Sequence, residues 1–161
     1  MPSQIYLIRH GIATWPAWPG PDSDRPLTAE GARRMEAAAA GLARRGLAPD
    51  VVLHSPLLRA RMTAEILATH LDRLGALHAH PALAPGFDVD HLHEILIEFG
   101  EATTVMCVAH NPDLGEIVMR LSRQPVMFKE GTLAALARKA SDRFTLAWQA
   151  TAEDLASDAP L

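Results

Sequence analysis

Short apolar runs that alternate with segments of helical periodicity are the feature that most constrains how this chain can fold. The runs that predict buried strands lie at residues 5–8, 50–54 and 103–109. Between Thr28 and Gly46, apolar side chains recur on one helical face, and these two residues are suited to begin and end a helix. Such alternation is typical of a mainly parallel sheet that helices cover on both faces.

Further segments complete the pattern. Ser55-Pro56, as N-cap and first helical position, predicts a second helix, and Asn111-Pro112 begins another that runs to about Leu121. A short strand, a helix, two hairpin strands and a loose tail are predicted at residues 77–80, 90–99, 132–138, 143–149 and 154–161. We therefore expect an α/β fold, a three-layer α/β/α domain over residues 1–161 with a mainly parallel central sheet and an antiparallel edge.

Composition narrows the class of protein. A net charge of −4 disfavours a general binder of nucleic-acid backbones. The single cysteine, Cys107, excludes a disulfide framework and a multi-cysteine metal site, and it is most simply a core residue. No apolar run is long enough to span a membrane, and the first residues lack the features of a signal peptide. We therefore expect a cytoplasmic protein without membrane contact.

Two arginines and two histidines follow the ends of three predicted strands. Arg9, His10 and Gly11 come directly after the first strand, Arg59 lies in the helix that follows the second, and His110 follows the last buried strand. Ligands of open α/β sheets bind beyond the carboxyl ends of the strands. The arginine fork suits phosphate oxygens, and histidine supplies a neutral nucleophile or a hydrogen-bond donor. This edge of the sheet is therefore suited to a dianionic phosphoryl group.

Local features agree with a phosphate site at this edge. Gly11 lacks a Cβ, so its backbone can turn sharply and approach a phosphate closely. The helices predicted from Ser55 and Pro112 direct their N-termini towards an anion. Arg59 lies in a first helical turn, where a cation opposes the helix dipole. Taken singly, His110 is more often a structural residue and Arg59 a solvated one, but their joint placement favours a functional site.

These residues resemble a known family. Arg9-His10-Gly11, residues 55–64 (SPLLRARMTA) and His110 are similar to the histidine phosphatase superfamily, also called phosphoglycerate mutase-like. The small size of the chain and three further segments resemble the SixA-type group of that superfamily, small phosphohistidine phosphatases of bacterial phosphorelays. These segments are Arg25-Pro26-Leu27-Thr28, Val126-Met127-Phe128 and residues 144–149, and the resemblance covers residues 5–150.

The resemblance implies a metal-independent phosphatase without a cofactor. His10 would attack phosphorus and carry a covalent phosphohistidine, so it must be unprotonated, and nearby guanidinium charges should lower its pKa from about 6.5. Arg9, Arg59 and His110 would act with it as catalytic residues that hold the phosphoryl oxygens and stabilise the transition state. The implied phosphate contacts are Arg9, Gly11, Arg25, Arg59 and His110.

One departure from the superfamily bears on the substrate. Larger members carry a glutamate general acid after the third strand, whereas residues 81–88 here contain no glutamate. An alkoxide leaving group needs a proton donor more than imidazole does, so the site favours P–N over P–O cleavage, with Asp88 and Asp90 as alternative donors. A chain of 161 residues has no room for the cap that encloses small metabolites. We therefore expect a phosphohistidine-bearing phosphotransfer protein as the partner. We also expect a phosphate or sulfate ion as a ligand of the pocket.

Alternative interpretations remain at several positions. The proline-rich residues 11–26 predict a long functional loop, in which Trp15 and Trp18 either form a docking surface or pack the loop onto the body. His54, at a strand end, is more simply structural than functional, and the remaining histidines lack metal-ligand spacing. The alternative functions are hydrolysis of small phosphoesters or phosphoanhydrides in the same pocket, and non-catalytic binding of a phosphoprotein. The presence of His10 argues against non-catalytic binding, because a protein that only binds a phosphoprotein needs no nucleophile.

Overall fold

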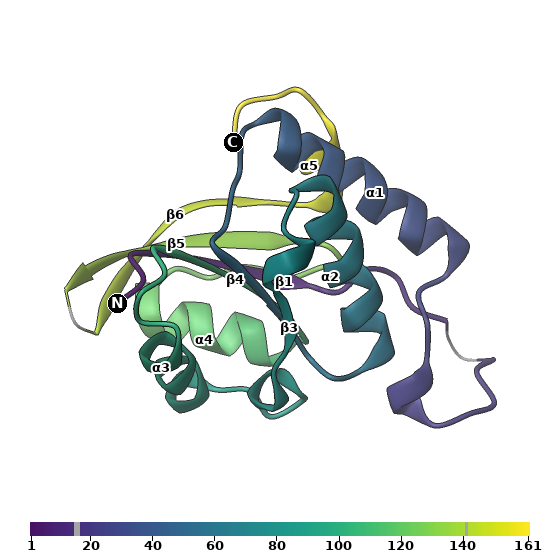
Figure 1. Ribbon diagram of the computed structural model, residues 1–161, viewed down its shortest axis with the longest axis horizontal. Coiled ribbons are helices and arrows are strands. Elements are labelled where there is room, and N and C mark those ends of the chain that lie inside the picture. The colour runs from purple at the N-terminus through teal and green to yellow at the C-terminus, as the bar shows by residue number, and fades with distance from the viewer. Residues whose placement is uncertain (15–16, 141) are drawn as a thin grey trace.

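A single twisted sheet organises the chain, of which the computed structural model describes residues 1–14, 17–140 and 142–161 (Figure 1). In the described chain the sheet has six strands in the order β3-β2-β4-β1-β5-β6. The first four strands are parallel, whereas β5 runs antiparallel to β1 and β6 runs antiparallel to β5. The strands are β1 (Gln4–Arg9), β2 (Val51–His54), β3 (Leu77–Ala79), β4 (Thr104–Ala109), β5 (Leu133–Ala140) and β6 (Arg143–Ala150).

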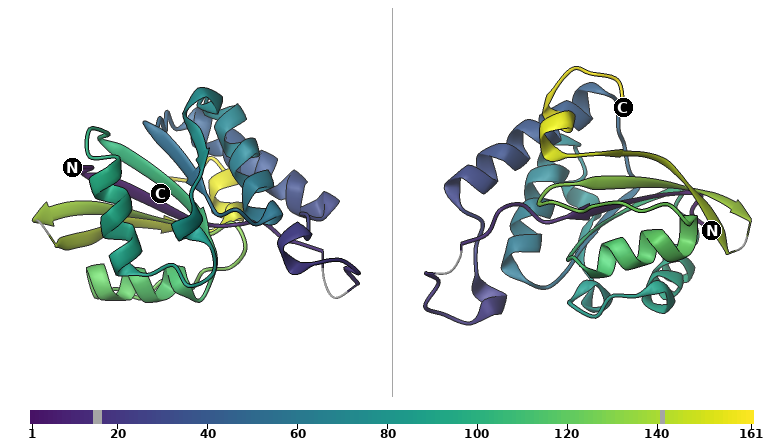
Figure 2. Two further views of the ribbon diagram at one scale, coloured as in Figure 1. Left: turned by 60° about the horizontal axis from the view of Figure 1, so that its bottom comes forward. Right: turned by 180° about the vertical axis from the view of Figure 1, so that it is seen from behind.

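Helices cover both faces of the sheet, as Figures 1 and 2 show. One face carries α1 (Ala29–Arg44), α2 (Leu58–His70) and α5 (Ala152–Ala156), and the other carries α3 (Val89–Glu98) and α4 (Asp113–Ser122). Side chains of β1 alternate between the two cores, since Ile5 and Leu7 pack with α3 and α4 while Tyr6 and Ile8 pack with α1 and α2. Burial on both faces explains the continuous apolar runs, and the three-layer α/β/α prediction is confirmed.

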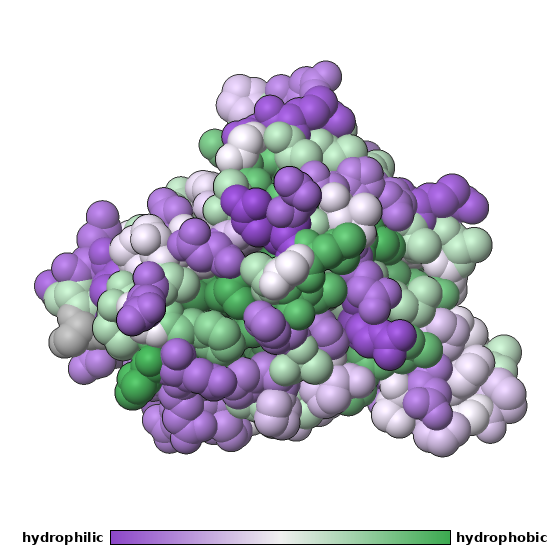
Figure 3. Space-filling model, viewed as in Figure 1, coloured by the Kyte–Doolittle hydropathy of each residue, from purple (hydrophilic) through white to green (hydrophobic). Residues whose placement is uncertain are grey.

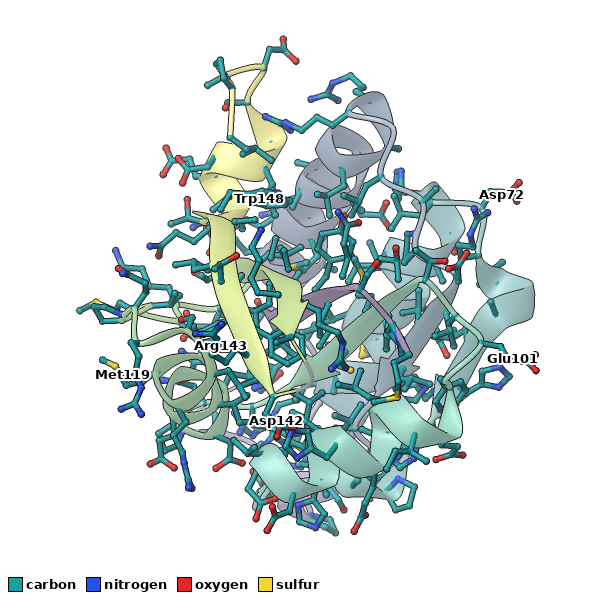
Figure 4. All side chains as sticks on the ribbon, turned by 90° about the vertical axis from the view of Figure 1, so that its left-hand side faces the viewer. Asp72, Glu101, Met119, Asp142, Arg143 and Trp148 are labelled. Carbon is teal, nitrogen blue, oxygen red and sulfur yellow. The ribbon has the colours of Figure 1, made fainter. Side chains whose placement is uncertain are left out.

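Side chains of the antiparallel edge pack on both faces of the sheet, with Phe144 in the α3 and α4 core and Trp148 against the α1 and α2 core. Trp148, which lies near the α5 end of β6 in Figure 4, has its ring centroid 6.0 Å from that of Tyr6 on β1. Short 3-10 turns complete the fold at η1 (Asp22–Asp24), η2 (Leu74–Ala76) and η3 (Pro81–Leu83). Apolar side chains are visible across the middle of the face in Figure 3, between the two helical layers. Within the described residues, no helix has the length and apolar character needed to cross a membrane.

Helix α1 begins and ends where its sequence signals predict. The hydroxyl of Thr28 accepts a hydrogen bond from the Gly31 backbone N–H at 2.8 Å, which satisfies one free donor of the first turn. Gly46 follows the helix with a φ of +75°, a left-handed conformation that glycine adopts without a steric penalty. Both ends of this helix are thus set by local chemistry.

Two expectations about chain segments are wrong. Helix α2 begins at Leu58 after Leu57, not at Ser55, because the Ser55 hydroxyl contacts His110 instead of capping a helix. The C-terminal tail is not loose, since it contains α5, which begins with a capping box at Thr151. The guanidinium of Arg45 donates to the carbonyls of residues 155, 157 and 159 at 2.6–2.8 Å. These tertiary hydrogen bonds hold the tail against α1.

Candidate active site

A cavity of about 590 Å³ opens at the carboxyl ends of the parallel strands. The predicted residues Arg9, His10, Arg59 and His110, which come from three separate segments, all line it. The strand-end argument therefore brings the right segments together. The complete lining is Arg9, His10, Ile12, Ala13, Arg25, Arg59, Pro85, Gly86, His110, Asn111, Pro112, Asp113 and Glu130.

His10 is buried at the base of this cavity, with 7% of its surface exposed. Its Nδ1 lies 2.8 Å from the Gly11 carbonyl oxygen. A carbonyl can only accept, so Nδ1 carries the proton and donates it, which leaves a lone pair on Nε2 of the neutral ring. Burial of the ring, together with the charges of His110, Arg59 and Arg9, lowers the pKa of His10 to about 3. The predicted direction is confirmed, but burial is the larger cause.

His110 lies beside His10, with 5.1 Å between the two ring centroids. Burial, followed by the charge of Arg59, lowers the pKa of His110 to about 4, so this ring is also neutral near pH 7. Its Nε2 is 2.7 Å from the hydroxyl of Ser55, which itself accepts a hydrogen bond from the Leu57 backbone N–H at 3.2 Å. The Ser55 hydroxyl has two lone pairs and one proton, so this contact fits either tautomer of His110. In the tautomer in which Ser55 donates to Nε2, Nδ1 of His110 carries the ring proton.

Arg59 reaches the cavity from the first turn of α2, with 7% of its side chain exposed. It donates to the Asp22 backbone carbonyl at 3.0 Å and pairs with the Asp22 carboxylate at 3.2 Å. Arg25 pairs with the other oxygen of that carboxylate at 3.1 Å and donates to the Thr14 carbonyl at 3.2 Å. Asp22 thus fixes two arginines of the cavity, a role that sequence reasoning did not assign to it.

Arg9 enters the cavity from the end of β1. Its Nη1 donates to the Phe128 carbonyl at 2.9 Å and lies 3.2 Å from the Glu130 carboxylate. Among the described residues, the Nε atoms of both Arg9 and Arg59 are buried without a hydrogen-bond partner. Buried donors without partners cost free energy, and a guanidinium offers five N–H groups in a planar fork. Each of these two side chains thus has an Nε–H group that no described residue satisfies.

Gly11 lies outside the residues that line the cavity, although it was among the expected phosphate contacts. Its N–H donates to the Thr63 hydroxyl at 3.0 Å, and that hydroxyl donates to the Arg59 carbonyl at 2.8 Å. A Cβ at this position would lie 2.7 Å from the Met35 side chain. The structure therefore accounts for the glycine by close packing against α1, and for Thr63 as the link between Gly11 and Arg59.

Two carboxylates that sequence reasoning missed, Asp113 and Glu130, line the cavity. Asp113 accepts a hydrogen bond from the Gly86 N–H at 2.8 Å, and Glu130 pairs with Arg9. Asp88 and Asp90 are absent from the lining. Asp88 caps α3, and the hydrogen bond that it accepts from the His91 N–H lowers the pKa of its carboxyl group. Glu130 was missed because β5 is antiparallel, so the residues before that strand, rather than after it, reach this edge.

Other candidate residues lie away from the cavity. His54 is buried with Nδ1 2.7 Å from the Ser55 carbonyl, and His80 pairs with Glu98 at 2.8 Å. In the part of the chain that the structure describes, no group of three His, Cys, Asp or Glu side chains is arranged for a metal ion. The indole N–H of Trp18 donates to the Pro21 carbonyl at 2.8 Å within its own loop, and Trp15 lies outside the described residues.

Comparisons with known proteins agree with this geometry. The model of the histidine phosphatase superfamily (branch 1) matches residues 5–84. The phosphohistidine phosphatase SixA of Escherichia coli is 31% identical over 151 residues, which are 91% of this chain and 92% of that protein. An uncharacterized protein of Picosynechococcus sp. is 40% identical over 119 residues, which are 70% of this chain and 69% of the relative.

A solved structure supports the same assignment. The protein histidine phosphatase SixA, in complex with tungstate, superposes with a TM-score of 0.84 at 29% identity, over 94% of this chain and 99% of that one. This chain belongs to the histidine phosphatase superfamily, in its SixA-type group.

Proposed function

We propose that this phosphatase hydrolyses phosphohistidine on a phosphotransfer protein, through a covalent phospho-His10 intermediate. The observation that carries the proposal is His10, a buried neutral imidazole in a cavity with Arg9 and Arg59. Its Nδ1–H is bonded to a carbonyl, and its Nε2 has no hydrogen-bond partner among the described residues. An imidazole must be neutral to attack phosphorus, and fixed positive charge stabilises the phosphoryl oxygens in the transition state. The similarity to SixA, and the binding of the oxyanion tungstate by SixA, support the proposal.

In the first step, the Nε2 lone pair of His10 attacks phosphorus. The P–N bond to the substrate imidazole breaks, and its electron pair returns to the substrate nitrogen. Arg9, Arg59 and the Nδ1–H of His110 stabilise the charge on the phosphoryl oxygens. The guanidinium groups supply the positive charge that a metal ion supplies in other phosphatases, so the proposed reaction is metal-independent.

In the second step, water attacks the phosphorus of phospho-His10. The proton stays on Nδ1 of His10, which keeps donating its hydrogen bond to the Gly11 carbonyl. The phosphorylated ring is therefore cationic, and it leaves phosphorus as neutral imidazole. The P–N electron pair returns to Nε2, and the water proton passes to phosphate and solvent. His10 therefore needs no separate acid to regain its starting state.

The carboxylates of the cavity favour the same choice of leaving group. Asp113 accepts a hydrogen bond from the Gly86 N–H, and Glu130 pairs with Arg9. In these contacts both carboxylates act as acceptors, and neither acts as a proton donor. A phosphohistidine with a proton on its other ring nitrogen brings its own proton and leaves as neutral imidazole. An alkoxide leaving group has no such help. The negative charge of the two carboxylates also stabilises the protonated substrate ring.

The competing substrate class is a small phosphoester or phosphoanhydride, because a cavity of about 590 Å³ has room for one. Access distinguishes the two classes. The described elements pack on one sheet, and we propose that residues 1–161 form one domain without a cap, which leaves the cavity open to a protein. We also propose that the protein acts in the cytoplasm, together with the phosphotransfer protein that is its substrate.

The test compares a phosphorylated histidine-phosphotransfer domain with an aryl phosphate. We expect a higher kcat/KM for the phosphoprotein, and acid-labile radiolabel from it on His10 in a rapid quench. His10→Ala should abolish both reactions, whereas His78→Ala, on the exposed edge strand β3, should change neither. Faster cleavage of the aryl ester would refute the substrate assignment, and retained turnover in His10→Ala would refute the mechanism.

A further inference from the structure

An apolar groove of about 670 Å³ lies beside the cavity, between α4 and the segment that follows it. We call it the methionine groove. Met119 lies on its α4 side, Val126, Met127 and Phe128 lie on its other side, and Asn111 and Pro112 form one end. Figure 2 shows α4 on the face of the sheet opposite α1. The groove therefore belongs to the outer surface of the α3 and α4 layer.

The lining of this groove is mainly apolar, with Glu116 and Arg120 as its charged residues. Val126 and Phe128 are buried in the core, at 8% and 3% exposure, whereas Met127 between them is 80% exposed and Met119 is 44% exposed. Figure 4 shows Met119 projecting from α4 away from the sheet. Methionine is unbranched and polarizable, so it adapts to the shape of a partner. Clustered apolar side chains at the surface are typical of protein interaction sites.

The groove and the cavity share part of their walls. Asn111 and Pro112 line both of them. The Phe128 carbonyl, at the inner side of the groove, accepts a hydrogen bond from Nη1 of Arg9 at 2.9 Å. A polypeptide with a phosphorylated side chain in the cavity must therefore continue across one of the rims, and this rim is apolar and open.

We propose that the methionine groove docks the helix of the phosphotransfer protein that carries the phosphohistidine. This proposal rests on the proposed function. A helix with its side chains is about 10–12 Å wide, so it cannot enter the cavity with its histidine and must lie on the rim. Apolar residues three or four positions from the phosphohistidine lie on the same helical face, within about 5–6 Å of it. Those residues would pack against Met119 and Met127.

The test places a charge in the groove and measures two substrates. The double variant Met119→Glu/Met127→Glu should lower kcat/KM for a phosphorylated histidine-phosphotransfer domain about tenfold or more, mainly through KM. Hydrolysis of an aryl phosphate should stay within about twofold, because that ester makes no contact beyond the cavity. The matched control is Ile97→Glu, which charges an exposed apolar residue on α3 outside both the groove and the cavity. Met127→Leu should retain activity on both substrates.

Each other outcome counts against the proposal. Equal losses on both substrates would mean that the double variant disturbs the cavity, and unchanged activity on the phosphoprotein would mean that the groove makes no contact with it. A wild-type dimer that the double variant converts to a monomer in sedimentation would assign the groove to a second copy of this chain. A wild-type enzyme that cleaves the aryl phosphate but not the phosphoprotein would refute the proposed function itself.

Discussion

Acid should destabilise this protein through the two buried imidazoles of the cavity. Burial lowers the pKa of His10 from 6.5 to about 3 and that of His110 from 6.5 to about 4, so both rings stay neutral in the folded chain. Below about pH 6.5 the unfolded chain binds protons that the folded chain does not. The stability that the neutral rings contribute is therefore complete above that pH, and it is lost as the pH falls towards the folded pKa values.

The size of the effect follows from the shifts. Because the pKa of His10 is lowered from 6.5 to about 3, the free energy of unfolding should fall by about 2 kcal/mol between pH 7 and pH 5. His110, with a folded pKa of about 4, costs about 2 kcal/mol over the same range. The combined loss of about 4 kcal/mol is a large share of the roughly 5–15 kcal/mol that stabilises a typical domain.

The assay is urea unfolding at pH 7 and pH 5, with His10→Gln beside the wild type. The variant should lose about 2 kcal/mol less than the wild type between the two pH values, because its side chain at position 10 does not titrate. His78→Gln is the control, since that ring is exposed on β3, and it should follow the wild type. A His10→Gln variant whose stability falls as steeply as that of the wild type would refute the assignment of a neutral buried ring.

Three further predictions follow from single contacts. Ser55→Ala removes the hydroxyl at 2.7 Å from Nε2 of His110, so kcat should fall about tenfold, with recovery in Ser55→Thr; an unchanged kcat would exclude a positioning role. Asp113→Asn should lower kcat/KM for phosphohistidine more than for an aryl phosphate, and equal losses would contradict stabilisation of the protonated leaving group. Gly41→Ala places a Cβ 1.7 Å from the Leu155 carbonyl, so urea unfolding should show a loss of about 1–3 kcal/mol; no loss would mean that the tail moves freely.

The candidate site shows where local reasoning succeeds and where it stops. Arg9, His10 and His110 could be placed together because each follows a strand whose apolar run is visible in the sequence. Ser55 was misread because its N-cap chemistry is the same whether it bonds a helix or a distant imidazole. Only the packing of β2 against β4 places His110 within its reach.

Glu130 marks a second limit of local reasoning. It precedes a strand that the sequence predicts, but its ion pair with Arg9 forms only because β5 pairs antiparallel with β1. The same holds for Asp22, which lies in the proline-rich loop and reaches Arg59 through the fold of that loop. Contacts of this kind depend on strand order and loop path, which no short segment of sequence encodes.

The sequence by itself determined the three-layer α/β/α fold, the basic and imidazole residues at the strand ends, and the likeness to histidine phosphatases. Periodicity and caps are local, so they can be read one segment at a time. Tertiary structure alone decided that burial, more than nearby charge, keeps His10 neutral, which carboxylates fix Arg9 and Arg59, and that the methionine groove adjoins the cavity. Burial and charge proximity are properties of residues that are distant in sequence, and they exist only once the chain has packed.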